Sequence, residues 1–323
     1  MRAIVATAAG GPDVLEVQER EVPVPGPGQL LVEVAAAGVN FMDIYGRQGR
    51  KPYAGTLPWV PGAEGAGTVV AAGEAAGGLA PGDCVAWAAA PGSYAESVLV
   101  DAERAVRVPE GVDLRAAAAV MLQGMTAHYL CHSTYPVGPG EVAVVHAAAG
   151  GVGLLLTQMV KRRGGRVVAT TSGGSKREAA RAAGAEECAG YDDFGGAARR
   201  LSGGAGAAVV YDGVGAATWD ASLDALARRG YLVSYGSASG PVPPVELLRL
   251  TAAGSVFVTR PTLGDYVATR QELEWRAEDL FSWMAAGDLT VTIGATYPLA
   301  DAARAQEDLA ARRTSGKLLL VPR

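Results

Sequence analysis

The stretch "VVHAAAGGVG" at residues 144–153 has the residue types of a turn that holds nucleotide phosphates. Such a turn reads G-x-G-x-x-G, and here Ala148, Gly150 and Gly153 take the three glycine positions. Glycine at the second position lets the backbone approach a pyrophosphate, and glycine at the third allows a helix to pack closely on a strand. Alanine at the first position is compatible with a negative φ. The turn follows an apolar strand and precedes a helix with an apolar stripe, formed by Val152, Leu155, Leu156, Met159 and Val160. We therefore expect a dinucleotide whose pyrophosphate lies at the N-terminus of this helix.

The segment "SGGSKRE", about 20 residues further on, indicates which dinucleotide is bound. Sites for NAD place an Asp or Glu here, where it bonds the ribose 2′-hydroxyl. This segment has no acid before Glu178, and Ser172, Ser175 and Lys176 offer hydroxyls and a positive charge that suit a 2′-phosphate. The sequence therefore favours NADPH. The alternative is that the two basic residues only begin a solvated helix.

Residues that could bind a metal are few and scattered. The chain has three cysteines, Cys84, Cys131 and Cys188, and three histidines, His128, His132 and His146. The cysteines form no C-x-x-C pair, so neither a disulfide framework nor a zinc knuckle is expected. The histidines have no Cys or carboxylate at metal spacing, which is typical of structural histidines. We expect no bound metal.

Two different patterns of apolar residues along the chain predict the strands and helices that carry these residues. Residues 1–123 alternate short apolar strands with Pro- and Gly-rich turns, which is typical of a small, mainly β, barrel-like unit. Residues 124–261 alternate six apolar runs with helical patterns, which predicts a doubly wound parallel sheet of six strands. The tail, 262–323, is expected to rejoin the first unit. Its expected elements are helices at about 273–286 and 300–311, a strand near 290–293 and a last strand in "GKLLLV". The fold class is therefore α/β with two domains.

Composition excludes several classes of function. With 323 residues, 49% hydrophobic and 19% charged, the chain is an ordinary globular protein long enough for two domains. A net charge of −5 without a run of Lys or Arg argues against a nucleic-acid partner. The N-terminus lacks the apolar region of a signal peptide, and no apolar run reaches the roughly 18 residues of a membrane helix. We expect a cytoplasmic protein with no membrane partner.

Further motifs extend over essentially the whole chain. They are "AAAGVNFMDIYGRQG", "PGAEGAGTVVAAG", "MLQGMTAHYL", "HAAAGGVG", "VVYDGVG", "VSYGSASG", "FVTRPTL" and "RRTSGKLLLVP". In these motifs the chain resembles the zinc-free quinone oxidoreductases of the medium-chain dehydrogenase/reductase superfamily, the ζ-crystallin-like group. The resemblance implies a GroES-like catalytic domain, 1–123 with 262–323, and a Rossmann domain for NADPH, 124–261. This division agrees with the two patterns of apolar residues described above.

The resemblance also bears on the metal. Where related alcohol dehydrogenases read G-H-E-x-x-G, this chain reads "GAEGAG", with Ala63 at the histidine position. Asn40 stands where those enzymes have a cysteine-containing segment, and their four-cysteine lobe is missing. Without a Lewis acid, hydride transfer needs an acceptor that is already electrophilic, and a quinone is one.

The segment "NFMDIY" is implied by the resemblance to line the reaction cleft. Tyr45 is expected to donate a hydrogen bond to the quinone oxygen, and Asn40 to hold the carboxamide or the substrate. The family's second tyrosine position is Lys51 here, with Tyr53 two residues later, and which of the two takes over is open. For Tyr45 the alternative is a packing aromatic. The cofactor neighbours expected on this segment are Phe41, Met42 and Asp43.

The other cofactor contacts implied by the resemblance lie in the turn, in the 2′-phosphate segment and at strand ends. They are Thr126, Gly150, Gly151, Val152, Ser172, Gly173, Gly174, Ser175, Lys176, Tyr191, Gly215, Tyr235, Gly236, Ser237, Ala238, Phe257, Val258, Thr259 and Arg312. For Arg312 the alternative is a solvated helix end, and for "YGSASG" it is a plain loop.

NADPH-dependent quinone reduction is the function that these motifs favour. A reductase of enals or enoyl thioesters is the alternative, because the loop "RKPYAGTLPW" does not settle the substrate. A non-catalytic crystallin-like or RNA-binding role is a remote third, opposed by the acidic charge and the intact turn. The sixth strand, "SVFVT", lies at a sheet edge and predicts a homodimer by pairing with its copy.

Overall fold

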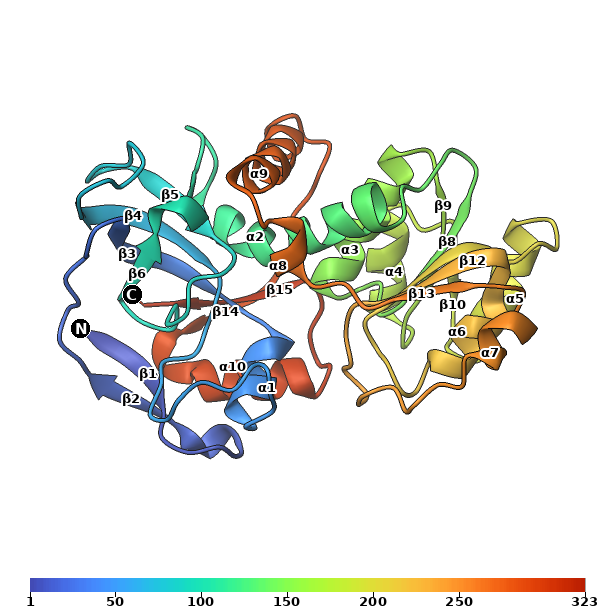
Figure 1. Cartoon of the computed structure of the whole chain (residues 1–323), viewed down its shortest axis with the longest axis horizontal. Helices are drawn as coiled ribbons and strands as arrows, with labels where there is room; N and C mark the ends of the chain where they lie inside the picture. The colour runs from blue at the N-terminus through green and yellow to red at the C-terminus, as the bar shows by residue number, and fades with distance from the viewer. Residues whose placement is uncertain (323) are drawn as a thin grey trace. The chain divides into compact units, whose positions relative to one another are not determined.

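A computed structural model describes residues 1–322, and the chain forms two compact units (Figure 1). The first unit comprises Met1–Gln123 and the tail from Val267, and the second comprises Gly124–Tyr266. The first boundary falls within helix α2 (Leu114–Tyr129).

The second boundary follows the short helix α8 (Leu263–Tyr266), rather than residue 261. The Tyr266 ring stacks on Tyr129 with 4.3 Å between the ring centroids. The Tyr266 hydroxyl accepts a hydrogen bond from Thr134 Oγ1 at 2.9 Å. These contacts, all within the second unit, explain why α8 belongs to it.

The second unit has the predicted parallel sheet of six strands, in the order β10-β9-β8-β11-β12-β13. Every neighbouring pair is parallel, and the strand order reverses between β8 and β11. The strands are β8 (Val142–Val145), β9 (Arg166–Thr170), β10 (Glu187–Ala189), β11 (Ala207–Asp212), β12 (Leu226–Ser234) and β13 (Phe257–Thr259). The helices between them are α3 (Gly151–Arg162), α4 (Ser175–Ala182), α5 (Phe194–Leu201), α6 (Trp219–Ala225) and α7 (Leu248–Ala252). This is the doubly wound Rossmann arrangement, in which ligands bind outside the carboxyl ends of the strands near the reversal.

Apolar strands and helix stripes form the core of this unit. Val144, Val168 and Val210, from three neighbouring strands, are buried with Phe194 of α5 and Trp219 of α6. In α3 the predicted stripe is buried except for its first member, which is half-exposed at the turn. Each fully buried Leu, Val or Phe stabilises the fold by roughly 1.5–3 kcal/mol, which is why the continuous apolar strands are covered on both faces.

The first unit has a sheet of seven strands and a small two-stranded sheet, β1-β2. The larger sheet has the order β14-β15-β3-β4-β5-β7, and β6 also pairs with β3. The strands are β1 (Arg2–Ala6), β2 (Leu15–Glu19), β3 (Gln29–Val39), β4 (Gly65–Ala72), β5 (Cys84–Trp87), β6 (Ser97–Asp101), β7 (Val106–Arg107), β14 (Ile293–Pro298) and β15 (Lys317–Val321). Its other helices are α1 (Phe41–Arg47), α9 (Arg270–Ala285) and α10 (Ala302–Ala310). Because β15 pairs with β3, the tail completes a sheet begun near the N-terminus.

Two expected elements of the tail have different bounds. The helix expected from residue 273 begins at Arg270, because Thr269 caps it: Thr269 Oγ1 accepts from the Glu272 amide at 3.2 Å. The Glu272 carboxylate accepts from the Thr269 amide in return, a capping box. The strand expected near 290–293 lies further along the chain: β14 runs over Ile293–Pro298, where it pairs with β15.

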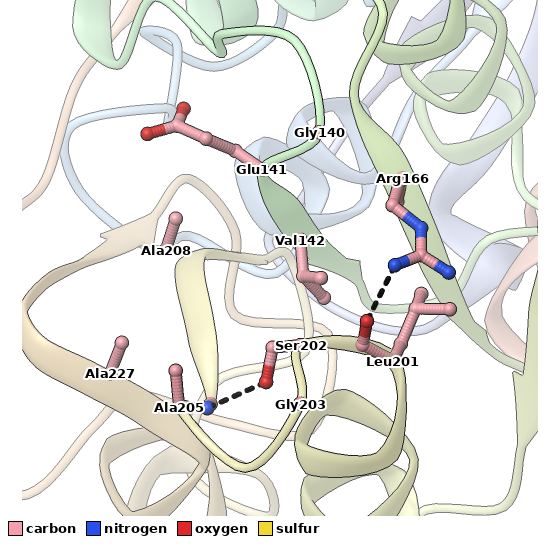
Figure 2. Close-up of a pocket in the computed structure, with 11 residues that line it drawn as sticks. Gly140, Glu141, Val142, Arg166, Leu201, Ser202, Gly203, Ala205, Ala208 and Ala227 are labelled. Atoms are coloured by element: carbon pink, nitrogen blue, oxygen red, sulfur yellow. Dashed lines mark hydrogen bonds between the residues drawn. The ribbon is translucent and has the colours of Figure 1, made fainter.

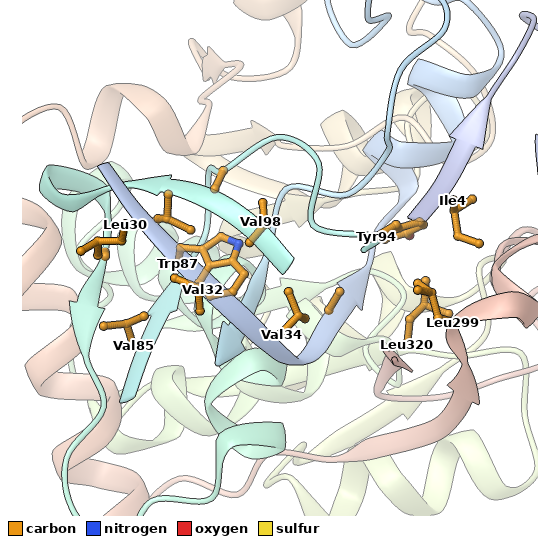
Figure 3. Close-up of a cluster of buried hydrophobic side chains, with 14 of the residues drawn as sticks. Ile4, Leu30, Val32, Val34, Val85, Trp87, Tyr94, Val98, Leu299 and Leu320 are labelled. Carbon is orange, nitrogen blue, oxygen red and sulfur yellow. The ribbon is translucent and has the colours of Figure 1, made fainter. Parts of the chain in front are cut away.

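The core of the first unit is formed mainly by side chains of β3, β5, β6 and β15 (Figure 3). Val32 and Val34 pack with the buried ring of Trp87, whose indole nitrogen donates to Ser93 Oγ at 2.9 Å. Leu320 of β15 belongs to the same cluster, so the tail contributes to this core. Among residues 1–322, no helix is long and apolar enough to span a membrane.

Candidate active site

The glycine turn joins β8 to α3 and lies at the carboxyl end of the parallel sheet. A methyl group on Gly153 would lie 2.5 Å from the Ala147 carbonyl oxygen, so this position needs glycine for close packing of helix on strand. The left-handed residue of the turn is Ala147, with φ of 49°, and Ala148 stays outside the left-handed region. Alanine at the first motif position is therefore accommodated. The first amides of α3 have no partner inside the helix, which is the arrangement that binds a pyrophosphate.

A buried network of hydrogen bonds holds the residue directly before this turn. His146, directly before the turn, has its Nδ1 3.0 Å from Thr170 Oγ1 and its Nε2 2.9 Å from Ser222 Oγ. The Ser222 hydroxyl reaches the carboxylate of Asp212 at 3.5 Å. Burial lowers the pKa of His146, so the ring is neutral and its two nitrogens act as one donor and one acceptor. The network ties together the ends of β8, β9 and β11.

Asp212 also shapes the loop after β11. Its Oδ1 accepts from the amides of Val214 at 2.7 Å and Gly215 at 3.0 Å, and its Oδ2 accepts from Thr218 Oγ1 at 2.7 Å. Gly215 has φ of 91°, a left-handed conformation that favours glycine. The loop is therefore held by the same carboxylate that reaches the His146 network.

The segment from Ser172 to Lys176 follows β9 at the same edge of the sheet. Ser172 and Ser175 are exposed, and Gly173 and Gly174 have φ of 98° and 54° with open space beside them. Two exposed hydroxyls, a lysine and two glycines with open space beside them, without an acid, fit a 2′-phosphate.

Tyr191 follows β10, the strand next to β9. Its ring lies over His146, with 5.8 Å between the ring centroids and 24° between the planes. The expected adenosine-side residues Ser172, Lys176 and Tyr191 thus follow neighbouring strands beside the glycine turn. This donor set fits the phosphorylated half of NADPH.

The loops after β11 and β12 pack against each other. A methyl group on Gly236 would lie 2.5 Å from the Gly213 carbonyl oxygen, so the two loops need glycine to approach. The Tyr235 amide donates to the Asp212 carbonyl at 2.8 Å, and the Ala238 amide donates to the Gly213 carbonyl at 3.2 Å. The loop of Tyr235, Gly236, Ser237 and Ala238 therefore lies at the carboxyl ends of the strands, next to the loop after β11.

The expected nicotinamide neighbours on β13 differ in their distance from the carboxyl ends of the strands. Thr259 pairs with Val233, close to the end of β12, whereas Phe257 pairs with Tyr231 further back. The Phe257 ring stacks on the Tyr231 ring at 4.6 Å. Phe257 is 50% exposed and Val258 is 37% exposed, and the cofactor contacts expected for these residues and for Thr259 stay predictions.

Two other expected cofactor contacts lie outside these loops. Thr126 is buried in α2, and Arg312 follows α10 in the first unit with φ of 55°. Their roles stay predictions.

Helix α1 carries the expected substrate residues, and an aromatic row lies along it. The Tyr45 ring centroid is 5.5 Å from that of Tyr53 and 6.2 Å from that of Phe41. The Arg50 guanidinium lies 5.4 Å from the Tyr45 ring centroid. Lys51 is exposed. The Tyr53 ring thus lies beside Tyr45, and whether Tyr53 or Lys51 takes over the second tyrosine position stays open.

Asn40 is directed into the protein rather than toward a ligand. Its Oδ1 accepts from Lys317 Nζ at 2.8 Å, and its Nδ2 donates to Glu64 Oε2 at 2.9 Å and to the Gly38 carbonyl at 3.3 Å. Both polar atoms of the carboxamide thus bond to neighbouring groups of the protein, and the ligand contact expected for Asn40 stays a prediction.

Asp43 is also buried, while Met42 beside it is half-exposed. The Oδ2 of Asp43 accepts from the Tyr94 hydroxyl at 2.8 Å and from the Asn40 amide at 2.8 Å. Burial raises the pKa of Asp43 to about 6, although both hydrogen bonds oppose the rise. Asp43 thus braces the first turn of α1.

Sequence reasoning missed Glu64, Tyr94 and Lys317 as partners of Asn40 and Asp43. Glu64 and Lys317 lie in motifs that were recognised, "GAEGAG" and "GKLLLV", but no spacing rule connects residues so far apart. The one signal in the sequence for a buried charge was that each of these charged residues stands next to apolar residues of a strand.

A pocket at the other edge of the parallel sheet is not the cofactor site (Figure 2). It encloses about 370 Å³ and is lined by Val142 and Arg166, at the amino ends of β8 and β9. Two of its polar side chains bond within the protein, as Figure 2 shows: Arg166 donates to the Leu201 carbonyl, and Ser202 Oγ accepts from the Gly206 amide. Arg166 also donates to Glu186. Ligands of such sheets bind at the carboxyl ends.

Comparison with known proteins agrees with this architecture. The protein-family model for the alcohol dehydrogenase GroES-like domain matches residues 26–110, and the family model for zinc-binding dehydrogenases matches residues 151–282. A quinone oxidoreductase of Pseudomonas aeruginosa is 44% identical over 99% of both chains. The chain belongs to the quinone oxidoreductase family. The predicted GroES-like and Rossmann domains are those of this family.

Two further similar proteins bear on cofactor and substrate. The crystal structure of Escherichia coli quinone oxidoreductase complexed with NADPH superposes with a TM-score of 0.97, at 39% identity and full coverage of both chains. A 2-haloacrylate reductase from Burkholderia is 38% identical over 99% of this chain and 98% of its own. Although one matching family model is named for zinc, no three His, Cys, Asp or Glu side chains within residues 1–322 are grouped to hold a metal ion.

Proposed function

We propose that this chain reduces quinones with NADPH and without a metal ion. The observation that carries the proposal is the glycine turn together with an acid-free, hydroxyl-rich segment at the carboxyl edge of the parallel sheet. The NADPH complex of a relative with the same fold supports the cofactor. The P. aeruginosa and E. coli relatives, both quinone oxidoreductases, support the acceptor.

The residues of the second unit hold the cofactor in this proposal. Amides at the start of α3, from Gly151 and Val152, bind the pyrophosphate, and Ser172, Ser175 and Lys176 bind the 2′-phosphate. When bound, the reduced nicotinamide supplies a hydride. The net reaction consumes NADPH, a proton and the quinone, and it yields NADP⁺ and the hydroquinone.

The residues of α1 and the loop after it contact the substrate. The Tyr45 hydroxyl donates a hydrogen bond to the quinone oxygen on which negative charge develops. The rings of Tyr45 and Tyr53 offer flat, amphipathic surfaces on which a planar quinone packs. Because the product is aromatic, this hydrogen bond and correct orientation replace a Lewis acid.

Reduction of an activated carbon–carbon double bond is the second candidate. The similarity to a 2-haloacrylate reductase favours it, since that substrate carries a double bond next to a carboxylate. Enals and enoyl thioesters have a carbonyl oxygen that also gains negative charge during hydride transfer, so the same hydroxyl would serve.

A substrate screen tests the proposal and separates the two candidates. NADPH oxidation is followed with 1,4-benzoquinone and naphthoquinones, and in parallel with 2-alkenals, a crotonyl thioester and 2-chloroacrylate. We expect kcat/KM for the best quinone to exceed that for the best alkene by about tenfold or more. Turnover of the alkenes alone would select the second candidate, and no turnover with any acceptor would contradict both.

We further infer a cytoplasmic homodimer. Strand β13 lies at the edge of its sheet, with β12 as its neighbour on one side only. Phe257 and Val258, both on β13, are 50% and 37% exposed. Pairing of β13 with its copy across a two-fold axis would cover this apolar edge. The cysteines are all free thiols, which suits a reducing compartment.

A further inference from the structure

A buried ion pair lies directly behind the N-terminus of α1. Lys317 on β15 is 1% exposed and Glu64, before β4, is 0% exposed, and the Lys317 ammonium contacts the Glu64 carboxylate. Buried charges are costly unless they are paired and fully hydrogen-bonded. Here the second carboxylate oxygen accepts from the Leu122 amide of α2 at 2.7 Å.

Asn40 completes this arrangement. Its carboxamide bridges the two charges, with Oδ1 on the Lys317 ammonium at 2.8 Å and Nδ2 on Glu64 Oε2 at 2.9 Å. Asn40 is itself only 5% exposed. The three side chains form a closed cluster whose polar groups bond to one another, and such a cluster can hold its members rigidly in place.

The backbone around the cluster is adapted to it. A methyl group on Gly38 would overlap both the Glu64 carboxylate and the Lys317 side chain, although Gly38 has no left-handed φ that would require glycine. The Gly38 amide donates to the Glu64 carbonyl at 3.0 Å, which joins the end of β3 to the segment before β4. The cluster thus connects β3, β15 and α2 at one point.

Helix α1 begins at this point. Asn40 is its N-cap, and the Asn40 amide donates to Asp43 Oδ2 at 2.8 Å in the first turn. Tyr45 lies one turn further along, with its ring beside Tyr53. A shift of the Asn40 side chain would therefore move the start of the helix that carries Tyr45.

We propose that Lys317 and Glu64 are positioning residues that act through Asn40 to fix α1 and the Tyr45 hydroxyl. This inference rests on the proposed function for its kinetic consequence, but the placement of Tyr45 can be measured without any substrate. Asn40 is in this view part of the same positioning cluster rather than a catalytic residue.

Four variants test the cluster. Lys317→Met leaves Glu64 buried and unpaired, whereas Lys317→Met combined with Glu64→Gln removes both charges and leaves a neutral core. Lys317→Arg keeps the charge. Arg107→Met, which removes an exposed ion pair with Asp83 in the same unit, is the matched control.

The double variant decides between positioning and mere stability. We expect it to regain the melting temperature lost in Lys317→Met, with kcat for the quinone still lowered about tenfold or more and the KM for NADPH unchanged. Lys317→Arg is expected to recover part of kcat, and the control to match the wild type. Full recovery of kcat along with stability in the double variant would overturn the proposal.

A fluorine probe gives a readout that does not depend on activity. The protein is labelled with 3-fluorotyrosine, and the Tyr45 signal is assigned with Tyr45→Phe. We expect the double variant to shift or broaden the Tyr45 signal and leave that of Tyr231, in the second unit, unchanged. An unmoved Tyr45 signal refutes the inference even if quinone reduction is established, and a moved signal supports it even if the true acceptor is another compound.

Discussion

Replacing Asp43 with asparagine is expected to change how the stability of the first unit depends on pH. Burial raises the pKa of this carboxyl from 3.8 to about 6, even with hydrogen bonds from Tyr94 and the Asn40 amide. Each pKa unit corresponds to about 1.4 kcal/mol, so ionised Asp43 costs the folded state about 3 kcal/mol relative to the protonated form. The asparagine variant lacks this cost.

Whether stability rises or falls with pH depends on which state, folded or unfolded, keeps the proton on Asp43. Between pH 3.8 and about 6 the folded protein keeps a proton on Asp43 that the unfolded chain has released. Stability from this carboxyl is therefore present at low pH, is lost as pH rises through that window, and is constant above it. Because the unfolded carboxyl is already mostly ionised at pH 4.5, we expect about 2 kcal/mol of the loss between roughly pH 4.5 and pH 8.

Urea unfolding of both proteins across this pH range measures the effect. Four of the five tryptophans lie in the first unit, and Trp219→Phe in both backgrounds leaves fluorescence that reports on that unit alone. Titrating groups that do not interact with Asp43, including buried His146 in the second unit, affect both proteins equally and cancel in the difference. Asp83→Asn is a control of opposite sign, since the hydrogen bond from Arg107 lowers the pKa of Asp83. Parallel pH profiles for the wild type and Asp43→Asn would refute the reasoning.

Four further outcomes are expected. Lys176→Glu removes the preference for NADPH over NADH, which we place at about tenfold or more, or ~1.4 kcal/mol, while Lys161→Glu at the far end of α3 keeps it; equal use of both coenzymes by the wild type would contradict the 2′-phosphate assignment. Tyr45→Phe lowers kcat for the quinone about tenfold, the loss of one hydrogen bond, and an unchanged kcat would leave Tyr45 a packing residue. Prolonged dialysis against a chelator leaves activity unchanged, and stoichiometric zinc by elemental analysis would be inconsistent with this. Val258→Lys on β13 converts a dimer into a monomer in sedimentation, whereas a monomeric wild type would exclude the proposed pairing.

The fold was largely predictable because its signals are local. Apolar runs of strand length separated by helical stripes predict a parallel sheet, and all six runs between residues 142 and 259 form strands. The glycine turn was recognisable for the same reason, since strand, turn and helix are consecutive. The bounds of α9 and β14 were less predictable, because a capping box and the partner strand set them.

The substrate side was less predictable because its interactions are between distant segments. The type of residue at position 40 suggested a ligand contact, yet Lys317 and Glu64 bond its whole carboxamide. Whether Tyr53 or Lys51 stands beside Tyr45 depends on how the loop folds back, which periodicity does not encode. The raised pKa of Asp43 depends on burial, a property of the packed unit.

The return of the tail to the first sheet has a consequence for biosynthesis. As the chain leaves the ribosome, Glu64 and β3 emerge long before β15, which supplies a neighbouring strand and the ammonium that neutralises Glu64. All six strands of the second unit lie between these two segments in the sequence, so the second unit can fold before β15 has been synthesised. The N-terminal strands therefore spend most of translation with an exposed sheet edge, and chaperone demand or aggregation during expression should fall mainly on them.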